Sequence, residues 1–323
     1  MKRFPVILDC DPGVDDAVAI LLAKQLPELD VRAITTVAGN VEVEKTYANA
    51  HRILHVAKWE VPVYMGAAKP LVGTQVTATG IHGADGLGGV EVPGAAIPPV
   101  PEERAWDVIY REAVAAGGAL ELIAVGPLTN LAIAFAKYRE LPKLIRRIVI
   151  MGGAATLGNT TPAAEFNIYA DPEAAEMVFQ SGVPVHMVGL DVTLKSYLTA
   201  SEIDAIAALG NEQAKFFHGI LQNVLAFSTK LGLPGVSMHD PAAVLYAVDA
   251  SLFQAEEAGV HVECKGSITR GKTVTDLYSD AQFEKNAYVV TEVDRPAFVE
   301  RVKTLLARYA EPNRRRALPH GQA

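Results

Sequence analysis

The residues from Val6 to Ala17 constrain the fold of this chain more than any other stretch. Positions 6–8 are an apolar run typical of a buried strand, and apolar residues at helical spacing follow from Val14. Pro12-Gly13 lies between the two and indicates a tight turn. A strand that leads through a short turn into a helix is the first unit of an α/β sheet. Such sheets bind their ligands at the carboxyl ends of the strands.

The same stretch contains four aspartates, Asp9, Asp11, Asp15 and Asp16. Carboxylates this close repel one another unless a cation or bound protons offset their charge. One alternative is a single helix N-cap accompanied by solvated acids. Asp9 and Asp11 directly follow a buried strand, however, and this favours a functional site. Because oxygen-only ligands suit calcium or magnesium, the segment predicts a site for a hard cation.

Strands and helices alternate along most of the remaining chain, which predicts a parallel sheet with right-handed crossovers. We expect strands at 6–8, 31–37, 61–65, 120–125, 145–151 and 183–190. We expect helices at 14–24, 42–57, 105–116 and 126–136, from 171 onward, at 201–230 with a break at Gly210-Asn211, at 239–247 and at 294–307. Residues 260–290 are β-rich with hairpin-like turns.

The fold class that follows is α/β: a single-domain, open, mostly parallel Rossmann-like sheet with flanking helices and a small β-rich C-terminal section. No repeat, low-complexity segment or composition change marks a second domain. We therefore expect one domain over residues 1–310 and a flexible C-terminal tail over 311–323. The tail holds the one basic cluster, Arg314-Arg315-Arg316, which indicates a frayed terminus rather than a binding patch.

One segment departs from the alternation. Residues 66–101 are dense in glycine and proline, and we expect residues 80–86 to be a loop. A connection of this length inside a compact domain is usually functional or disordered. His82 lies among glycines here, which favours a functional loop over a plain surface insertion.

Charge and cysteine content limit the partners and the location. The chain of 323 residues has a formal net charge of −8, which disfavours a nucleic-acid partner. Cys10 and Cys264 are its only cysteines, so a disulfide framework is not expected. Residues 1–20 lack the apolar region of a signal peptide, and no apolar run reaches membrane-spanning length. We expect a cytoplasmic protein that binds neither nucleic acid nor membranes.

The common cofactor and nucleophile motifs are absent from the sequence. Residues 153–158 approach a P-loop, but Asn159 stands where that motif requires lysine. The chain contains neither a GxSxG nucleophile elbow nor an HExxH zinc motif. These absences argue against NAD, ATP and serine-hydrolase chemistry.

Polar groups that follow other expected strands converge on the same edge of the sheet. They are Asn40, the main chain at Val125 and the segment 165–167. The pair His239-Asp240 opens a later helix. Each of these alone is typical of a turn or a helix cap. Their coincidence on one edge indicates a binding site.

Several blocks, in register along nearly the whole chain, resemble the nucleoside hydrolases, in particular the inosine-uridine-preferring type. The block from Asp9 to Ala17 is similar to the signature of that family. The other similar blocks follow in order at 33–40, 81–83, 126–130, 149–153, 164–167, 188–191 and 239–241.

The resemblance implies a calcium-dependent enzyme that hydrolyses the N-glycosidic bond of ribonucleosides to ribose and a free base. By matching positions, the implied calcium ligands are Asp11, Asp16, Asp240 and the backbone carbonyl of Val125. The implied substrate-binding residues are Asp15, Asn40, His82, Asn159, Glu165, Phe166 and Asn167.

The implied catalytic residues are Asp11 and His239. Water deprotonated towards Asp11 would attack the anomeric carbon, and His239 would assist departure of the base, with His82 nearby. These residue types suit the chemistry, because carboxylates stabilise an oxocarbenium-like sugar and a proton donor helps a leaving base. Histidine can supply that proton near neutral pH.

Base preference is implied by two positions. Purine-specific relatives stack the base on a tryptophan, and His82 matches that loop position here. Some inosine-uridine relatives carry tyrosines before the His-Asp pair, whereas residues 225–238 contain none and Phe227 is the nearest aromatic residue. The resemblance therefore implies broad or pyrimidine-leaning specificity.

Two other functions remain open from the residues alone. A haloacid-dehalogenase-like phosphatase also places Asp-x-Asp after its first strand, although Pro12-Gly13 and the Asp15-Asp16 pair are not its pattern. A non-catalytic nucleoside- or ribose-binding protein could keep the same site with Asp11 and His239 dispensable. The resemblance further implies a homodimer or homotetramer.

Overall fold

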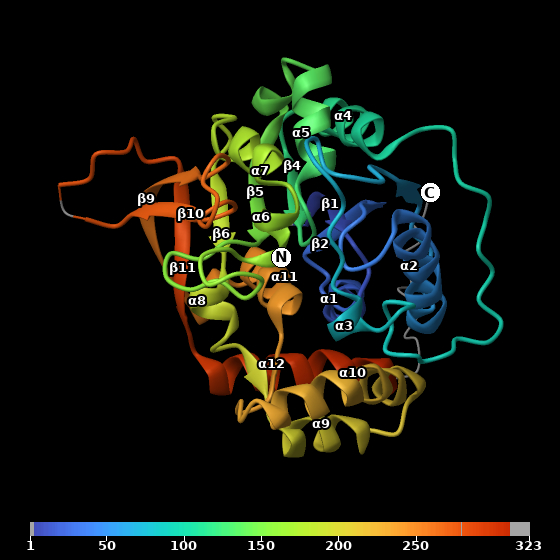
Figure 1. Cartoon of the computed structure of the whole chain (residues 1–323). Coiled ribbons are helices and arrows are strands. Elements are labelled where there is room, and N and C mark those ends of the chain that lie inside the picture. Colours follow the sequence, from blue (N-terminus) through green and yellow to red (C-terminus); the bar gives the residue numbers. More distant parts are fainter. Residues whose placement is uncertain (1–2, 279, 311–323) are drawn as a thin grey trace, which may run out of the picture.

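The structure, a computed structural model, describes residues 3–278 and 280–310 (Figure 1). The expected flexible tail at 311–323, with its Arg314-Arg315-Arg316 cluster, lies outside the described residues. The described part builds a large central sheet with helices packed against it, as the alternating pattern predicts.

The central sheet has nine strands in the order β10-β9-β11-β6-β5-β4-β1-β2-β3. Neighbouring strands are parallel except where β9 pairs with β10 and β11. This confirms the open, mostly parallel sheet and the β-rich C-terminal section. The strands are β1 (Phe4–Cys10), β2 (Leu29–Thr36), β3 (Val63–Met65), β4 (Leu120–Ala124), β5 (Ile145–Met151), β6 (Val185–Val188), β9 (Phe253–Val262), β10 (Thr273–Asp276) and β11 (Ala287–Val293). Two short strands, β7 (Tyr197–Leu198) and β8 (Val236–Ser237), form a separate antiparallel pair.

Helices cover both faces of the sheet. They are α1 (Val14–Lys24), α2 (Val43–Ala57), α3 (Thr79–His82), α4 (Ala105–Ala116), α5 (Thr129–Lys137), α6 (Phe166–Ala170), α7 (Pro172–Phe179), α8 (Leu190–Thr193), α9 (Ala200–Ala207), α10 (Glu212–Lys230), α11 (His239–Val248) and α12 (Arg295–Ala307). Short 3-10 turns lie at η1 (Leu141–Leu144), η2 (Ala250–Leu252) and η3 (Arg308–Ala310).

The first strand shows why the core has two halves. Val6 and Leu8 belong to the apolar core that contains α1, α10, α11 and α12, whereas Ile7 belongs to the core beneath α4, α5 and α7. Successive side chains of a strand point to opposite faces, so a strand that is covered on both faces must be apolar throughout. The uninterrupted apolar run at 6–8 follows from this position.

The strand order creates a switch point at β1. From β1 the chain continues outward to β2 and β3, and it then returns to β4 on the other side. Hydrogen bonds from Val37 N to Cys10 O (3.0 Å) and from Val125 N to Asp9 O (2.8 Å) hold the segments that follow β2 and β4 against the end of β1. Ligands bind open α/β sheets in the crevice at such a point.

Most of the expected elements form within one or two residues of their predicted bounds. The helix at 105–116 and the strand at 145–151 match the structure. The break at Gly210-Asn211 separates α9 from α10, because Gly210 adopts a positive φ of 74° and Asn211 caps α10 by accepting from Ala214 N.

The expected loop at 80–86 is partly wrong. Residues 79–82 form the single helical turn α3, in which the carbonyl of Ala78 accepts hydrogen bonds from the backbone N–H groups of Ile81 and His82. One turn is too short to show helical periodicity, so the glycines around it dominated the pattern. Two more short elements, α6 and β8, likewise lie outside the strands and helices expected from the sequence.

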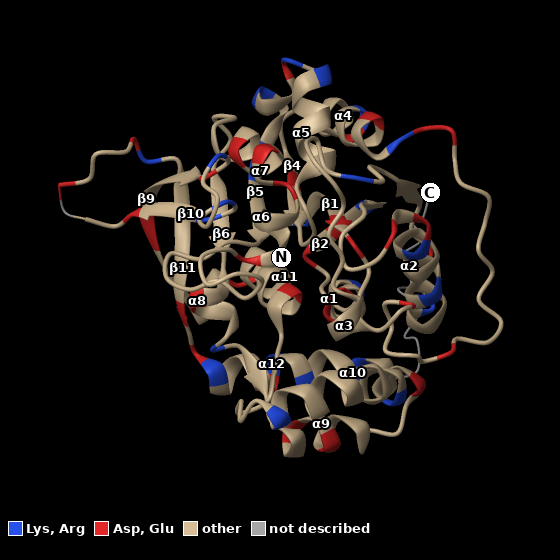
Figure 2. Cartoon of the chain, viewed as in Figure 1, with Lys and Arg blue, Asp and Glu red and all other residues tan. Residues whose placement is uncertain are grey.

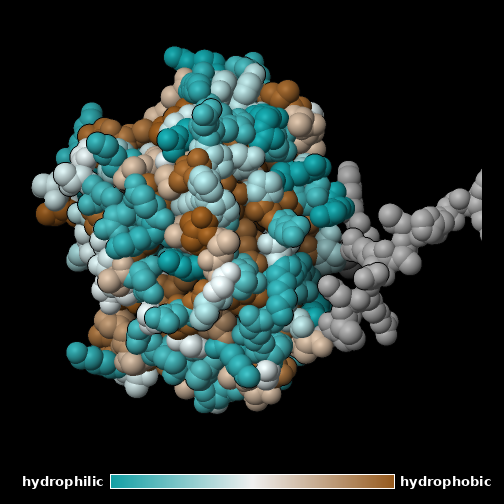
Figure 3. Space-filling view, turned by 90° about the vertical axis from the view of Figure 1, so that its right-hand side faces the viewer, coloured by the Kyte–Doolittle hydropathy of each residue, from teal (hydrophilic) through white to brown (hydrophobic). Residues whose placement is uncertain are grey.

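The surface carries charges of both signs. Lys and Arg lie close to Asp and Glu along outer helices such as α2 and α12 (Figure 2). The face on the right-hand side of Figure 1 is mostly hydrophilic, with smaller hydrophobic areas between (Figure 3). Among the described residues, no helix combines the length and the hydrophobicity needed to cross a membrane.

Candidate active site

A cavity of about 390 Å³ lies at the carboxyl ends of the central strands. We call it the carboxylate cavity. All the site residues expected from the sequence line it, except Asp11 and Asp16, which lie buried beside it. The expected residues that line it are Asp15, Asn40, His82, Val125, Asn159, Glu165, Phe166, Asn167, His239 and Asp240.

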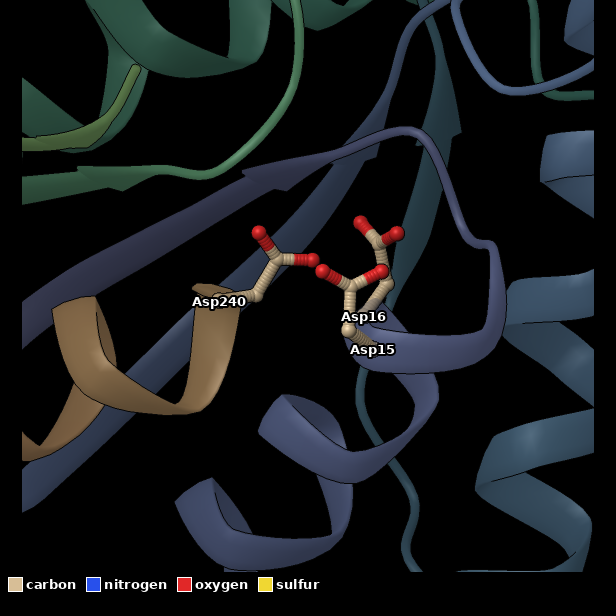
Figure 4. A group of neighbouring side chains, drawn as sticks. All are labelled: Asp15, Asp16 and Asp240. Atoms are coloured by element: carbon tan, nitrogen blue, oxygen red, sulfur yellow. The ribbon is translucent and has the colours of Figure 1, made fainter. Parts of the chain in front are cut away.

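Three carboxylates meet at one end of this cavity. Asp15 and Asp16 come from the first turn of α1 and Asp240 from the first turn of α11 (Figure 4). One oxygen atom from each lies within 4.8 Å of the others. Residues more than two hundred positions apart in the sequence are thus brought together because α1 packs directly against α11.

Asp11 adjoins this group through hydrogen bonds rather than as part of it. Its backbone N donates to Asp16 Oδ1 at 3.1 Å, and its Oδ2 accepts from Asn40 N at 2.7 Å. The Asn40 side chain donates to Asp16 Oδ2 and to the carbonyl of Asp11, both at 3.1 Å. The loop after β2 therefore holds the aspartate loop after β1 in place.

Glycines make this close packing around Asp11 possible. A Cβ atom on Gly39 would lie 2.0 Å from Asp11 Oδ2, and one on Gly126 would lie 2.6 Å from Asp11 Oδ1. The segments after β2 and β4 thus enclose the Asp11 carboxylate from two sides. Only a residue without a side chain fits at either position.

The buried carboxylates carry an uncompensated electrostatic cost. Burial, and next the Asp16 charge, raises the pKa of Asp11 well above its usual range. Burial, and next the Asp15 charge, raises the pKa of Asp16 to about 7 and that of Asp240 well above its usual range. Asp11 Oδ1 is buried and has no hydrogen-bond partner among the described residues. A cation or protons must therefore stabilise the group.

These atoms fit a divalent cation of the calcium or magnesium type. Every available donor is an oxygen, and Asp11 Oδ1 in particular has no other partner. The carbonyl of Val125 accepts a hydrogen bond from Asn167 Nδ2 at 2.9 Å, which leaves its second lone pair available. The chemistry of the donor set thus agrees with the metal site expected from the sequence.

The wall formed by 159–167 is held by its own side chains. Glu165 caps α6 by accepting from the backbone N of Asn167 (3.0 Å) and Ile168 (3.2 Å), and it also accepts from Gly153 N (2.9 Å). Burial raises its pKa to about 7. Asn159 Oδ1 accepts from Phe166 N at 2.9 Å. Polar side chains are thereby fixed along this wall of the cavity.

Two histidines line the cavity from different elements. His82 Nδ1 accepts from Val14 N at 3.1 Å, so α3 is tied to the first turn of α1. His239 Nδ1 is hydrogen-bonded to Thr193 Oγ1 at 2.8 Å. Burial lowers the pKa of both imidazoles below the ordinary value.

An apolar region of the lining was not expected from the sequence. It comes mainly from α3, the C-terminal half of α10 and the segment that follows it, together with Leu194. Its members are Ile81, Leu194, Leu221, Val224, Phe227, Leu231, Leu233 and Val236. Several of these are exposed, as Leu231 is at 57%. In the sequence, the only indication of this region is that Leu231 and Leu233 lie in a glycine- and proline-containing segment rather than in a periodic element.

Neither tryptophan is among the residues that line the carboxylate cavity. Phe227 belongs to its apolar region, and Phe166 belongs to its polar wall. The cavity therefore combines a carboxylate end, a polar wall and an apolar region, which suits a small molecule that has both a polar and an apolar part.

Comparison with known proteins relates the chain to one group of enzymes. The profile of the family described as "Inosine-uridine preferring nucleoside hydrolase" matches residues 6–300. The chain is 44% identical over 299 residues to the pyrimidine-specific ribonucleoside hydrolase RihA of Salmonella arizonae, which covers 92% of this chain and 96% of that protein. It is 42% identical over 309 residues to RihA of Escherichia coli strain ATCC 8739, with 95% and 99% covered.

Solved structures show the same relation. A plant nucleoside hydrolase, the PpNRh1 enzyme, superposes with a TM-score of 0.88 at 32% identity, covering 94% of this chain and 99% of that one. A purine-preferring ribonucleoside hydrolase from Gardnerella vaginalis gives a TM-score of 0.87 at 35% identity, with 94% and 98% covered. The similarity thus extends over nearly the whole length of each chain.

Proposed function

This chain belongs to the family of inosine-uridine preferring nucleoside hydrolases, and from this premise we propose that the carboxylate cavity is its active site. As a ribonucleoside N-ribohydrolase, it hydrolyses N-glycosidic bonds to release ribose and a free base. Membership in this family decides against both alternatives that the sequence left open, the phosphatase and the non-catalytic binding protein.

Calcium is the proposed cofactor, with Asp11, Asp16, Asp240 and the carbonyl oxygen of Val125 as its protein ligands. The observation that supports it is the buried, unpartnered Asp11 Oδ1 beside two further buried carboxylates. A bound calcium ion would offset their charge and polarise the oxygen atoms of water and of the sugar hydroxyls.

The ribose is proposed to lie along the polar wall. Asn159, Glu165 and Asn167 supply hydrogen-bonding groups there, with Phe166 beside them, and Asp15 and Asn40 line the same cavity. Because Glu165 and Asn167 are held by their own hydrogen bonds, they cannot move to compensate for a missing sugar hydroxyl, and a sugar that lacks one would bind less well. The enzyme should therefore select ribonucleosides over 2′-deoxyribonucleosides.

Hydrolysis is proposed to use Asp11 as base and His239 as acid. Asp11 takes a proton from water as the water oxygen bonds to the anomeric carbon. The N-glycosidic bond breaks, its electron pair leaves with the base, and His239 gives a proton to that base. Carboxylates around the ribose stabilise the positive charge that develops on the sugar.

The base is proposed to occupy the apolar region, with His82 nearby. A pyrimidine-leaning preference is supported by the relatives named pyrimidine-specific RihA, at 42–44% identity. The absence of a tryptophan from the cavity lining supports it further, because stacking on a large aromatic surface favours the larger purine.

The experiment measures ribose released from uridine, cytidine, inosine and adenosine, with metal-stripped and calcium-restored protein. We expect the greatest release from the pyrimidine nucleosides and activity that returns with calcium. Asp11→Ala should lose at least about 100-fold, the usual contribution of a general base. Asp204→Ala, on the exposed side of α9, is the control and should retain activity.

Each part of the proposal has its own contradicting result. Full activity in Asp11→Ala would remove Asp11 from the mechanism. Activity that magnesium restores and calcium does not would change the metal, and a preference for inosine would reverse the assignment of base specificity.

Assembly and location complete the proposal. We propose a cytoplasmic homodimer or homotetramer, as the family resemblance implies. Support for the location comes from Cys10 and Cys264, which are both free thiols in the structure and so suit a reducing compartment. Light scattering on the purified chain measures the assembly, and a monomer would contradict it.

A further inference from the structure

We propose that Thr193 is a positioning residue, which holds the imidazole of His239 so that its Nε2 atom faces the leaving base. The inference rests on the proposed role of His239 as proton donor. Thr193 is the last residue of the short helix α8, whose neighbour Leu194 lines the carboxylate cavity.

The contact between the two side chains is short and buried. Thr193 Oγ1 lies 2.8 Å from His239 Nδ1, and the threonine has no exposed surface. Within the described part of the chain, this hydroxyl makes no other hydrogen bond. Buried hydroxyl groups need a hydrogen-bond partner, and for Thr193 that partner is the His239 imidazole.

The hydrogen bond between Thr193 and His239 Nδ1 leaves the other ring nitrogen of His239, Nε2, available to the substrate. His239 Nε2 forms no hydrogen bond to the residues that the structure describes, and His239 lines the cavity. Without its Nδ1 partner, the ring could rotate about its bond to Cβ and turn Nε2 away. Because a hydroxyl both donates and accepts, Thr193 can hold either tautomer of the ring.

A hydroxyl also suits this location better than a carboxylate would. Histidines in catalytic sites are often oriented by a carboxylate or a backbone carbonyl. Here Asp240 follows His239 directly, and Asp15 and Asp16 lie next to Asp240. Another negative charge at position 193 would add to the repulsion among these buried groups, whereas a neutral hydroxyl orients the ring without it.

The test compares two substrates that differ in the need for a proton donor. Uridine has a leaving group that must be protonated, whereas 4-nitrophenyl β-D-ribofuranoside releases a stable phenolate and needs no acid. Thr193→Val keeps the shape of threonine and removes the hydroxyl. We expect its kcat on uridine to fall about 10- to 100-fold, with KM little changed and kcat on the nitrophenyl riboside within about twofold of wild type.

Three further variants complete the test. Thr193→Ser retains a hydroxyl and should recover most of the activity on uridine. Ser196→Ala removes a buried hydroxyl that bonds to Val192 O just beyond α8, and it should behave as wild type on both substrates. If Thr193→Val does not fold, Thr193→Ala removes the same hydroxyl without a second methyl group.

The outcomes separate this inference from the proposed function. Equal losses on both substrates, or unchanged activity on uridine, would overturn the positioning role of Thr193. His239→Ala that keeps full activity on uridine would remove the acid role and the inference with it. A wild-type chain that hydrolyses neither substrate would instead contradict the proposed function.

Discussion

Gly39 shows how little space the site leaves around its central acid. A Cβ atom there would lie 2.0 Å from Asp11 Oδ2 and 2.8 Å from the Cδ atom of Pro127. The neighbouring residue Asn40 donates its backbone N–H to the same oxygen. The position of this carboxylate is therefore determined by backbone packing as much as by hydrogen bonds.

We expect Gly39→Ala to lower kcat/KM for uridine by about 100-fold, because the new methyl group must displace the Asp11 carboxylate. The measurement is steady-state ribose release, with circular dichroism to confirm folding. Gly80→Ala is a matched control, since a Cβ atom at that position meets nothing within 4 Å. Undiminished activity in Gly39→Ala would show that Asp11 tolerates displacement.

Most residues that line the polar part of the cavity could be named from the sequence as candidates, but their contacts could not. Asp11, Asn40 and Glu165 stand out as polar groups after apolar strands, and the structure puts them at the same edge. Thr193 and the leucines of the apolar region follow no motif, because their role depends on which helix packs beside which. Such long-range contacts leave no local periodicity.

Among the elements, the β9–β10 hairpin supports a site loop far from it in sequence. Lys272 Nζ donates to the carbonyls of Ala154, Ala155 and Thr156 at 2.9–3.0 Å. Helix α8 holds the same segment as well, since Asp191 accepts from the backbone N of Ala155 and Thr156. The segment leads to Asn159 on the polar wall.

We expect Lys272→Met to raise KM for uridine roughly three- to tenfold with a smaller change in kcat, because the loop carries Asn159, which is proposed to bind the ribose and not the leaving base. Lys265→Met, at an exposed position in the same hairpin, should leave both parameters unchanged. Steady-state kinetics on the two variants decide the point. A fall in kcat without a change in KM would contradict this role for the loop.

The elements themselves were largely predictable, because in long segments such as 105–116 the apolar periodicity begins and ends where the helix does. The exceptions are single turns. Helices α3 and α8 have four residues each, and their hydrogen bonds form because neighbouring segments hold them. Local sequence carries little information on elements of this length.

At the scale of the whole molecule, the packing of the sheet against α11 partly buries an imidazole. His186 of β6 is hydrogen-bonded to the hydroxyl of Tyr246 (2.8 Å) and stacks on Tyr288 with 4.7 Å between ring centroids. Burial, and next the charge of Arg147, lowers the pKa of His186 to about 4. His186 therefore stays neutral in the folded protein at pH values between about 4 and 6.5, where the same histidine in the unfolded chain is protonated.

We expect this imidazole to make the free energy of unfolding fall as pH drops from 6.5 towards 4. The unfolded state binds more protons in that range, so stability decreases with acid. Since His186 is only partly buried, we expect about 1 kcal/mol between pH 7.5 and pH 5. Urea unfolding of wild type and His186→Gln at both pH values measures it, and an equal loss in both proteins would contradict the assignment.

The order of strands across the sheet was beyond the sequence pattern. The alternation of strands and helices predicts parallel strands, but no local sequence feature determines that β4 pairs with β1 rather than with β3. That choice produces the switch point and hence the location of the site. It follows from which apolar faces fit together over the whole chain.

The three carboxylates at the end of the cavity join an early and a late part of the chain, because Asp16 lies in α1 and Asp240 in α11. During synthesis the aspartate motif would leave the ribosome long before α11 exists. At typical translation rates the interval is roughly ten to fifty seconds. A nascent chain would therefore carry an incomplete set of the proposed metal ligands throughout that time. A cation could then bind to the full set only after α11 has been synthesised and has packed against α1.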